Sequence, residues 1–327
     1  MSSKQQQAPR FCADCFKGTL RGDVEPRGTE ETLYGLPTYV ARPEPGRGEP
    51  AGVVVILPDV FGWTLRNSRA LADAYANRIP AVVLLPELMN GHAIPDTVLA
   101  LGDGIQGQTS WWKKYLYIAP VMIATVVRYF IPLVIATRSG VIVPRIKNYL
   151  RAVRLSPPSP LPPHPSSSSP PSVDTGASAP KAIKVGVAGF CWGGKFVVQL
   201  CQLAAGPFGG GGGGSSGSEG EGERLIDCGF TAHPSFLTLP KDLETVVLPL
   251  SVANGDDDMM MPRAKMVEAK ELLGKKGGDF EIVEYPGAKH GFAVRGDPND
   301  QRQADFGMRA EDQAVGWFRR WFGQGAE

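Results

Sequence analysis

The sequence predicts an α/β fold in which a mostly parallel sheet is covered by helices on both faces. Short apolar runs rich in β-branched residues recur along the chain, and segments with helical spacing alternate with them. Runs of this kind are typical of strands that are buried on both sides of a parallel sheet. Strands that alternate with helices imply crossover connections, which a parallel sheet requires.

Five apolar runs are predicted to be strands: residues 53–58, 81–85, 183–188, 248–253 and 280–285. Helices are expected at residues 65–78, 196–203, 263–275 and 302–322, and the last of these is amphipathic and rich in Trp and Phe. The hydrophobic content of 43% is enough for a sizeable buried core. We therefore expect one domain that spans residues 1–327.

Charge and cysteine content exclude several classes of protein. The net charge is +1 at pH 7, so no nucleic-acid partner is expected. Residues 1–9 are polar and lack the apolar run of a secretory signal, which indicates a cytoplasmic protein. The five cysteines are few and odd in number, so no disulfide framework is expected. Cys12 and Cys15 form a CxxC pair without a second pair, and a structural role is favoured over zinc binding or redox chemistry.

The strongest chemical signal is Cys191, in the sequence GFCWGG at residues 189–194. A predicted strand precedes this segment and a predicted helix follows it, which is the context of a nucleophile elbow with Cys in place of Ser. The sharp turn requires small neighbours, and glycines provide them. At the start of a helix, the dipole and unpaired N–H groups favour a thiolate. The alternative is a glycine-rich turn that holds a structural cysteine.

A thiol nucleophile needs a base and an acid that orients the base. His290 lies after the last predicted strand and before the final helix, where the order nucleophile–acid–histidine places the base. The acid should follow the strand at 248–253, where three aspartates compete. We choose Asp258 because Gly-x-x-Asp followed by Pro is common at this point of the fold, and Asp256 is the runner-up.

An oxyanion hole requires two N–H donors in fixed positions. The residue after the nucleophile, Trp192, is expected to provide one backbone N–H. We expect the other from Val60, in the loop after the first central strand. Of the remaining histidines, His92 and His233 are expected in loops that line the rim of the pocket, and His164 lies in a Pro/Ser-rich segment.

With these residues, the chain resembles the dienelactone hydrolase family of the α/β-hydrolase superfamily, in its fungal branch. The matching segments are PDVFGW (58–63), PELMNG (86–91), GVAGFCWGGK (186–195), AHPS (232–235), NGDDDMMMP (254–262) and YPGAKHGFAVRGDP (285–298). The resemblance implies hydrolysis of lactones and related esters by a Cys–His–Asp triad, with no cofactor and no metal. It implies that Cys191, Asp258 and His290 form that triad.

The resemblance also suggests two residues that bind substrate or tune the thiol. Bacterial members of the family carry a Glu, which pairs with the thiol, where this chain has Asp59. An Arg just after the catalytic His binds the substrate carboxylate in those enzymes, and Arg295 is the nearest match. We therefore expect Arg295 to bind a carboxylate at the pocket mouth; the alternative is a pair with Asp297 or another surface acid.

Three stretches interrupt the α/β pattern. Residues 155–180 are rich in Pro and Ser and residues 206–223 in Gly, Ser and Glu, so both are expected to be low-complexity loops. Residues 115–143 are apolar and about as long as a membrane span, but Arg128 would be costly at the bilayer centre. We therefore expect residues 105–154 to form a helical lid over the active site, with possible peripheral contact to a membrane surface; a transmembrane helix is the alternative.

The sequence as a whole predicts an enzyme that cleaves a small ester or lactone through a thioacyl-enzyme on Cys191, of the carboxymethylenebutenolidase type. Two other functions remain open. One is a general carboxylesterase or thioesterase that acts on apolar acyl substrates, which an apolar lid would favour. The other is a binding protein without catalytic activity on the same fold, since a fold does not guarantee a function.

Overall fold

The structure is a computed structural model that describes residues 25–98, 119–161, 183–202, 208, 223–295 and 301–323. Cys12, Cys15, His164, Asp297, residues 105–118 of the expected insertion and most of both low-complexity segments lie outside these ranges.

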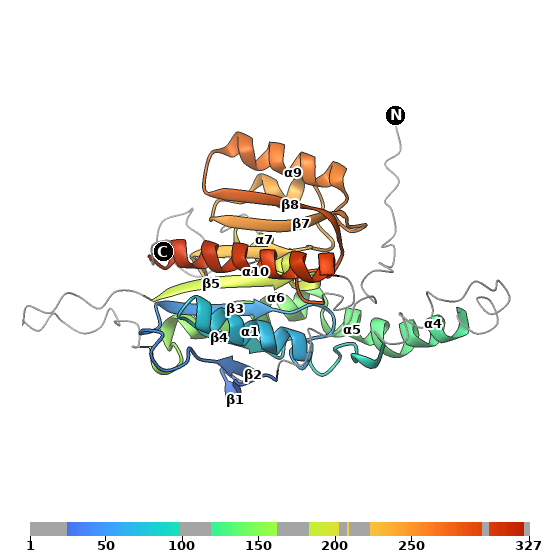
Figure 1. The fold of residues 1–327 in the computed structure, drawn as a ribbon. Coiled ribbons are helices and arrows are strands. Elements are labelled where there is room, and N and C mark those ends of the chain that lie inside the picture. Colours follow the sequence, from blue (N-terminus) through green and yellow to red (C-terminus); the bar gives the residue numbers. More distant parts are fainter. Residues whose placement is uncertain are drawn as a thin grey trace, which may run out of the picture.

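The centre of the molecule is an eight-stranded sheet with the order β1-β2-β4-β3-β5-β6-β7-β8 (Figure 1). The strands are β1 Thr29–Leu33, β2 Leu36–Ala41, β3 Gly52–Leu57, β4 Val82–Pro86, β5 Lys184–Phe190, β6 Cys228–Ala232, β7 Leu250–Asp257 and β8 Phe280–Lys289. The pairs from β4 through β3, β5, β6 and β7 to β8 are parallel, whereas β1 and β2 join one edge as an antiparallel hairpin. Every residue of β3 and β4 is buried, as expected for strands covered on both sides.

Helices cover both faces of the sheet. They are α1 Arg66–Arg78, α4 Ala119–Thr125, the π-helix η3 Val126–Phe130, α5 Ile131–Ala136, α6 Ser139–Leu155, α7 Trp192–Leu200, α8 Lys241–Glu244, α9 Arg263–Lys276 and α10 Gln301–Trp321. Two glycines of β5 show which helix packs on which face of the sheet. A side chain at Gly186 would meet Phe318 of α10, and one at Gly189 would meet Val197 of α7. Because residues three apart on a strand point to opposite faces, α10 and α7 cover opposite sides of the sheet.

The described structure confirms the predicted fold class. The five predicted strands correspond to β3, β4, β5, β7 and β8, and the four predicted helices to α1, α7, α9 and α10. The sequence analysis missed β1, β2 and β6. β1 (TEETL) is polar and mostly exposed, and β6 (CGFTA) is short and contains a glycine and a threonine, so neither shows a clear apolar pattern.

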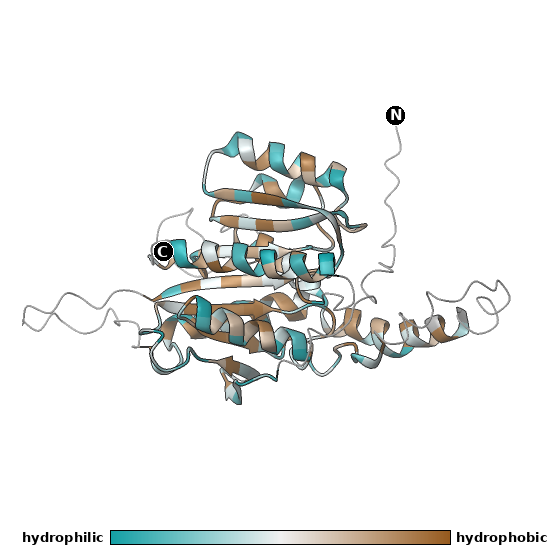
Figure 2. Cartoon of the chain, viewed as in Figure 1, coloured by the Kyte–Doolittle hydropathy of each residue, from teal (hydrophilic) through white to brown (hydrophobic). Residues whose placement is uncertain are grey.

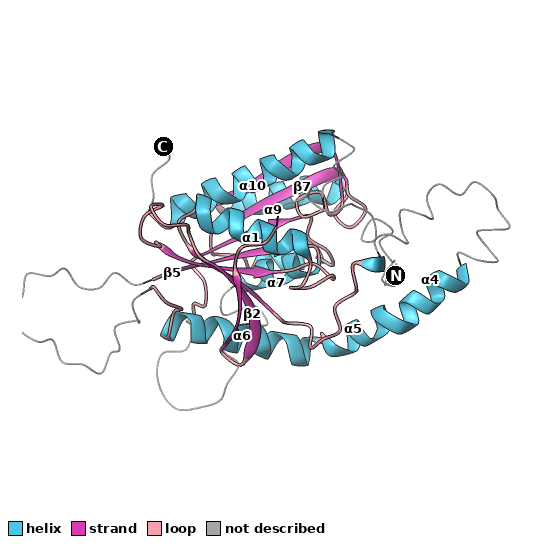
Figure 3. Cartoon of the chain, turned by 60° about the horizontal axis from the view of Figure 1, so that its bottom comes forward, coloured by secondary structure: helices cyan, strands magenta, loops and turns pink. Residues whose placement is uncertain are grey.

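The expected insertion at 105–154 does not form one uniform element. Its last part is α6, whose buried residues Ile142, Ile146, Tyr149, Leu150 and Val153 pack into the core. The Tyr149 hydroxyl also lies 3.1 Å from the Thr38 hydroxyl of β2. α6 is therefore a helix that covers the sheet rather than part of a lid. α5 and α4 extend from its start away from the body of the protein (Figure 3).

No single helix of the described residues is long and apolar enough to cross a membrane. One bent pair, Ile123–Ala136 with Ser139–Leu155, passes that test together by length and composition only, and its two halves meet at 58°.

Candidate active site

Cys191 lies in the turn between β5 and α7, with φ 50° and ψ −112°. This unusual backbone conformation is held on both sides: the Cys191 N–H donates to Ala232 O (3.3 Å), and Cys191 O accepts from the Gly194 N–H (3.1 Å) and the Ser235 N–H (2.9 Å). The turn packs closely on the end of β3, since a side chain at Gly193 would lie 2.1 Å from Leu57 O. This is the strand–turn–helix geometry expected of a nucleophile elbow.

Asp258 and His290 follow the ends of two neighbouring parallel strands, β7 and β8. The His290 Nδ1 atom lies 2.9 Å from Asp258 Oδ2 and 3.0 Å from Oδ1, and both side chains are fully buried. Asp258 Oδ1 also accepts hydrogen bonds from the N–H groups of Met260 (2.8 Å) and Met261 (3.3 Å). These contacts fix the carboxylate, which in turn orients the imidazole with Nε2 toward the thiol side of the site.

The runner-up acid, Asp256, has a different partner. Its Oδ1 atom accepts a hydrogen bond from the Gly287 N–H at 2.6 Å, at the exposed end of β8. The structure therefore brings Asp258, and not Asp256, to His290.

Ser235 lies between the thiol and the imidazole, and the sequence analysis gave it no role. Its Oγ atom is 3.4 Å from Cys191 Sγ and 3.4 Å from His290 Nε2. Ser235 comes from the loop after β6, and its side chain is completely buried. The only sequence signal for it was the matching segment AHPS, which does not say what the serine contacts.

The surroundings favour a charged His290. Burial lowers the pKa of an imidazole, but the negative charge of Cys191 and hydrogen bonds with Asp258 and Cys191 outweigh this, so the pKa of His290 is raised well above its ordinary value. His233 behaves in the opposite way. Its pKa is lowered well below the usual range by complete burial and by the nearby charges of His290 and Arg295. A neutral His233 ring thus lies edge-on to His290, with 5.0 Å between ring centroids.

Asp59 and Arg295 form a second buried pair beside the thiol. Arg295 Nε lies 3.4 Å from Asp59 Oδ2, and the guanidinium lies 5.0 Å from the centre of the Phe61 ring. Burial raises the pKa of Asp59 to about 6, although Arg295 opposes this shift and Cys191 adds to it. Arg295 was expected at the pocket mouth, but its side chain is fully buried against Asp59.

The two predicted oxyanion donors lie on segments that meet at the elbow. Trp192 is the first residue of α7, so its N–H precedes the first hydrogen bond of the helix. Val60 is in the loop that follows β3. The close contact between Gly193 and Leu57 O brings these two segments together.

The other predicted rim residues are placed differently. His92 is exposed, whereas His233 is completely buried and does not line a rim. Within the described part of the chain, no group of three or more His, Cys, Asp and Glu side chains could hold a metal ion.

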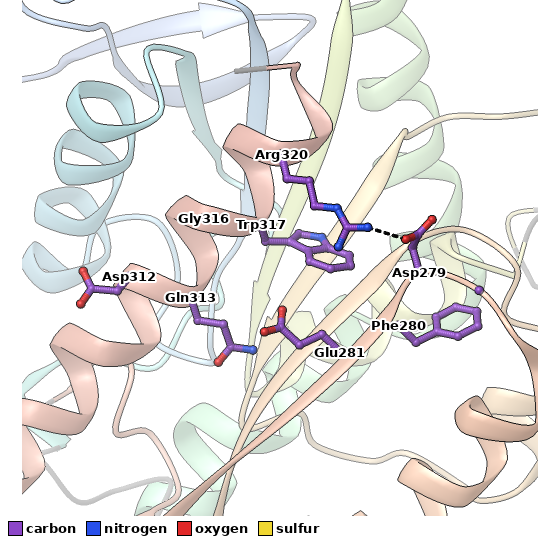
Figure 4. Close-up of a pocket in the computed structure, with 9 residues that line it drawn as sticks. Asp279, Phe280, Glu281, Asp312, Gln313, Gly316, Trp317 and Arg320 are labelled. Atoms are coloured by element: carbon purple, nitrogen blue, oxygen red, sulfur yellow. Dashed lines mark hydrogen bonds and ion pairs between the residues drawn. The ribbon is translucent and has the colours of Figure 1, made fainter. Parts of the chain in front are cut away.

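A surface cavity of about 590 Å³ lies elsewhere, between the start of β8 and α10 (Figure 4). Its lining includes Glu281, Trp317 and the ion pair between Asp279 and Arg320, but no residue of the site around Cys191.

The segment that carries these residues is similar in sequence to known proteins. The sequence model of the dienelactone hydrolase family matches residues 170–322, which include Cys191, Asp258 and His290. Over these residues, the chain is similar to the dienelactone hydrolase family.

Two fungal proteins are similar over nearly their full length. The hydrolase tropI of Talaromyces stipitatus is 28% identical over 316 residues, which cover 94% of this chain and 95% of that protein. The hydrolase pyvD of Aspergillus violaceofuscus is 25% identical over 311 residues, with the same coverage of 94% and 95%. Together with the family match, they support a hydrolase of the dienelactone hydrolase kind.

Solved structures agree on the fold. A putative dienelactone hydrolase from Klebsiella pneumoniae superposes with a TM-score of 0.54 at 14% identity, over 91% of this chain and 98% of that chain. Esterase 2 of Thermogutta terrifontis with bound propionate superposes with a TM-score of 0.52 at 14% identity, over 94% and 99%. The fold is therefore that of an α/β hydrolase.

Proposed function

We propose that this protein hydrolyses carboxylic esters or lactones through a thioacyl-enzyme on Cys191. The observation that carries the proposal is the continuous set of contacts from Cys191 through Ser235 and His290 to Asp258. A thiol at the start of a helix, next to an imidazole whose pKa is raised, is the arrangement that produces a thiolate–imidazolium pair.

The reaction proceeds in two stages. In the first, the Cys191 thiolate attacks the carbonyl carbon, and the oxyanion accepts hydrogen bonds from the N–H groups of Val60 and Trp192. The C–O bond of the ester then breaks, and the His290 imidazolium gives its proton to the departing oxygen. In a lactone this oxygen stays attached to the acyl chain as a hydroxyl group.

The second stage releases the acyl group. His290, now neutral, removes a proton from water, and the resulting hydroxide attacks the thioester carbon. The C–S bond breaks and the Cys191 thiolate leaves, so the carboxylic acid is released and the enzyme returns to its starting state. Asp258 holds the imidazole in one tautomer and stabilises its charged form throughout.

A substrate that bears a carboxylate fits the charge around this site. Arg295 is held beside Asp59, and burial raises the pKa of that carboxyl group to about 6. A substrate carboxylate that pairs with the guanidinium would compete with Asp59 for it. Arg295→Met should then raise KM for carboxylate-bearing lactones more than for neutral esters such as p-nitrophenyl acetate.

The decisive experiment combines a substrate panel with trapping of the intermediate. Purified protein is mixed with small lactones and with p-nitrophenyl esters, and mass spectrometry of the acid-quenched protein locates the acyl group. We expect it on the Cys191 peptide, and Cys191→Ala should abolish both turnover and adduct. Cys201 and Cys228 serve as internal controls, because burial raises the pKa of each thiol. Turnover by Cys191→Ala, or an adduct on another residue, would refute the proposal.

A further inference from the structure

An exposed apolar surface lies on the segment that extends from the body of the protein. Five large aliphatic side chains of α4, η3 and α5 are between 46% and 64% exposed: Ile123, Val127, Ile131, Val134 and Ile135. They follow one another at intervals of one to four residues, and we call them the aliphatic stripe. Figure 2 shows hydrophobic residues along this projecting segment, outside the body of the sheet and its helices.

The opposite side of the same segment packs against the hydrophobic core. Leu133 is buried in the core, and Tyr129 and Phe130 pack against that core. The segment thus has an apolar side that the protein covers and a second apolar side that faces solvent. Single exposed aliphatic residues are normal, but a continuous exposed row indicates a surface that contacts something else.

The charge of the surrounding sequence limits what this partner can be. Residues 104–173 contain no Asp or Glu and eight basic residues: Lys113, Lys114, Arg128, Arg138, Arg145, Lys147, Arg151 and Arg154. The last four of these contact the body: Arg145 donates to Leu88 O, Lys147 and Arg151 pair with Glu223, and Arg154 pairs with Asp227. Arg128 and Arg138 are exposed, one within the aliphatic stripe and the other just beyond it.

We propose that α4, η3 and α5 dock onto the surface of a bilayer that contains anionic lipids, with the aliphatic stripe in the interface and the two arginines at the headgroups. An aliphatic face bordered by basic residues and free of acids is the composition of an interfacial helix. The segment lies in the surface and does not cross it. A span would place Arg128 in hydrocarbon, and the helix that follows, α6, is held in the core by Ile142 and Ile146.

Sedimentation with lipid vesicles tests the proposal. Full-length protein is mixed with vesicles of phosphatidylcholine alone and with vesicles that also contain phosphatidylglycerol. We expect the protein to pellet with the anionic vesicles, to remain in the supernatant with the neutral ones, and to be released by high salt, which screens the arginines. Protein on the vesicles should also be released by carbonate, whereas retention after carbonate would overturn the surface position in favour of insertion.

Two sets of variants separate the apolar and the basic contributions. Val127→Asp and Ile135→Asp should each weaken vesicle binding by more than about tenfold, since each removes a large aliphatic side chain from the interface. Arg128→Gln with Arg138→Gln should weaken binding to anionic vesicles by about tenfold and abolish most of the salt dependence. The matched controls are Val267→Asp and Arg263→Gln on α9, at exposed positions away from the segment, which should bind as the parent protein does.

The remaining outcomes decide against a membrane. Size-exclusion chromatography with light scattering measures the oligomeric state of the same variants. A parent protein that ignores anionic vesicles but forms a dimer that Val127→Asp disrupts would show that a second copy covers the stripe. A monomer that binds neither type of vesicle would overturn the proposal as well. All variants should hydrolyse a soluble ester at the parental rate, so a failure of vesicle binding is separate from a failure of the proposed chemistry.

Discussion

Asp258→Asn is the change that tests the catalytic geometry most directly. Asparagine has nearly the same shape as aspartate, and its amide oxygen can still accept the hydrogen bond from the Met260 N–H. The loop after β7 should therefore keep its structure. The amide NH₂ would then face His290 Nδ1, which would have to act as an acceptor. The ring proton would move to Nε2, and a protonated Nε2 cannot take the proton of the Cys191 thiol.

The expected loss is large. In serine triads, the corresponding change costs about ten-thousandfold in kcat through the wrong tautomer, which corresponds to about 5.5 kcal/mol of transition-state stabilisation. Asp256→Asn is the matched control. The Asp256 carboxylate accepts a hydrogen bond from the Gly287 N–H, and the amide oxygen of asparagine can replace that acceptor, so we expect less than about threefold loss.

The assay is steady-state hydrolysis of a p-nitrophenyl ester by both variants, together with the rate of iodoacetamide alkylation of Cys191 as a function of pH. Loss of the Asp258 charge removes one of the causes that raise the pKa of His290, so the thiolate should require a higher pH. A thermal melt of each variant checks that the fold is intact. Equal activity of the two variants, or a larger loss in Asp256→Asn, would refute this assignment of the acid.

Three further predictions concern neighbouring groups. Ser235→Ala removes the hydroxyl between thiol and imidazole, so kcat should fall about tenfold and the pH dependence of thiol alkylation should shift, with KM unchanged; an unaltered alkylation profile would mean that Ser235 is only structural. Because burial raises the pKa of Asp59 to about 6, the contribution of this carboxyl group to folding stability is fully present below its unfolded value near pH 4 and is lost as the pH rises through 6. Urea unfolding should show a decline of about 2 kcal/mol between pH 4 and pH 7 that Asp59→Asn removes, and an equal decline in the variant would contradict this. Gly255→Ala should destabilise the protein and reduce activity together, since its Cβ would lie 1.8 Å from Ala288 O between the strands that carry the acid and the base; melting at the parental temperature would argue against this.

The arrangement of Cys191, His290 and Asp258 around one site could be predicted because its requirements are local or follow from chain order. The elbow around Cys191 needs only a strand, small neighbours and a helix, all within about twenty residues of sequence. Asp258 and His290 follow strands that turned out to be parallel neighbours, and the carboxyl ends of such strands meet at one edge of the sheet. The three candidate aspartates are consecutive in the sequence, but their side chains point in different directions. Asp258 contacts His290, whereas Asp256 contacts the Gly287 N–H.

Other parts of the site could not be predicted, because they depend on contacts between distant segments. Ser235 contacts Cys191 from 44 residues further along the chain, in the loop after a strand whose sequence CGFTA has no clear apolar alternation. Arg295 was expected to bind substrate or to pair with a surface acid, and its partner Asp59 lies on a loop near the other end of the described chain. The apolar pattern of residues 115–143 also gave no sign of the break between two helices. α5 ends at Ala136, and α6, which has a buried face, begins at Ser139.

The sheet topology explains how the site can stay fixed while the surface beside it varies. Asp59, Cys191, Ser235, Asp258 and His290 follow β3, β5, β6, β7 and β8 in turn, and these five strands are consecutive neighbours in the sheet. Each catalytic distance is therefore set across adjacent parallel strands. The segment with the aliphatic stripe leaves the sheet after β4, on the far side of β3 from Cys191. Changes in its length or apolar character can alter what the protein docks onto without changing the distances among the thiol, the imidazole and the carboxylate.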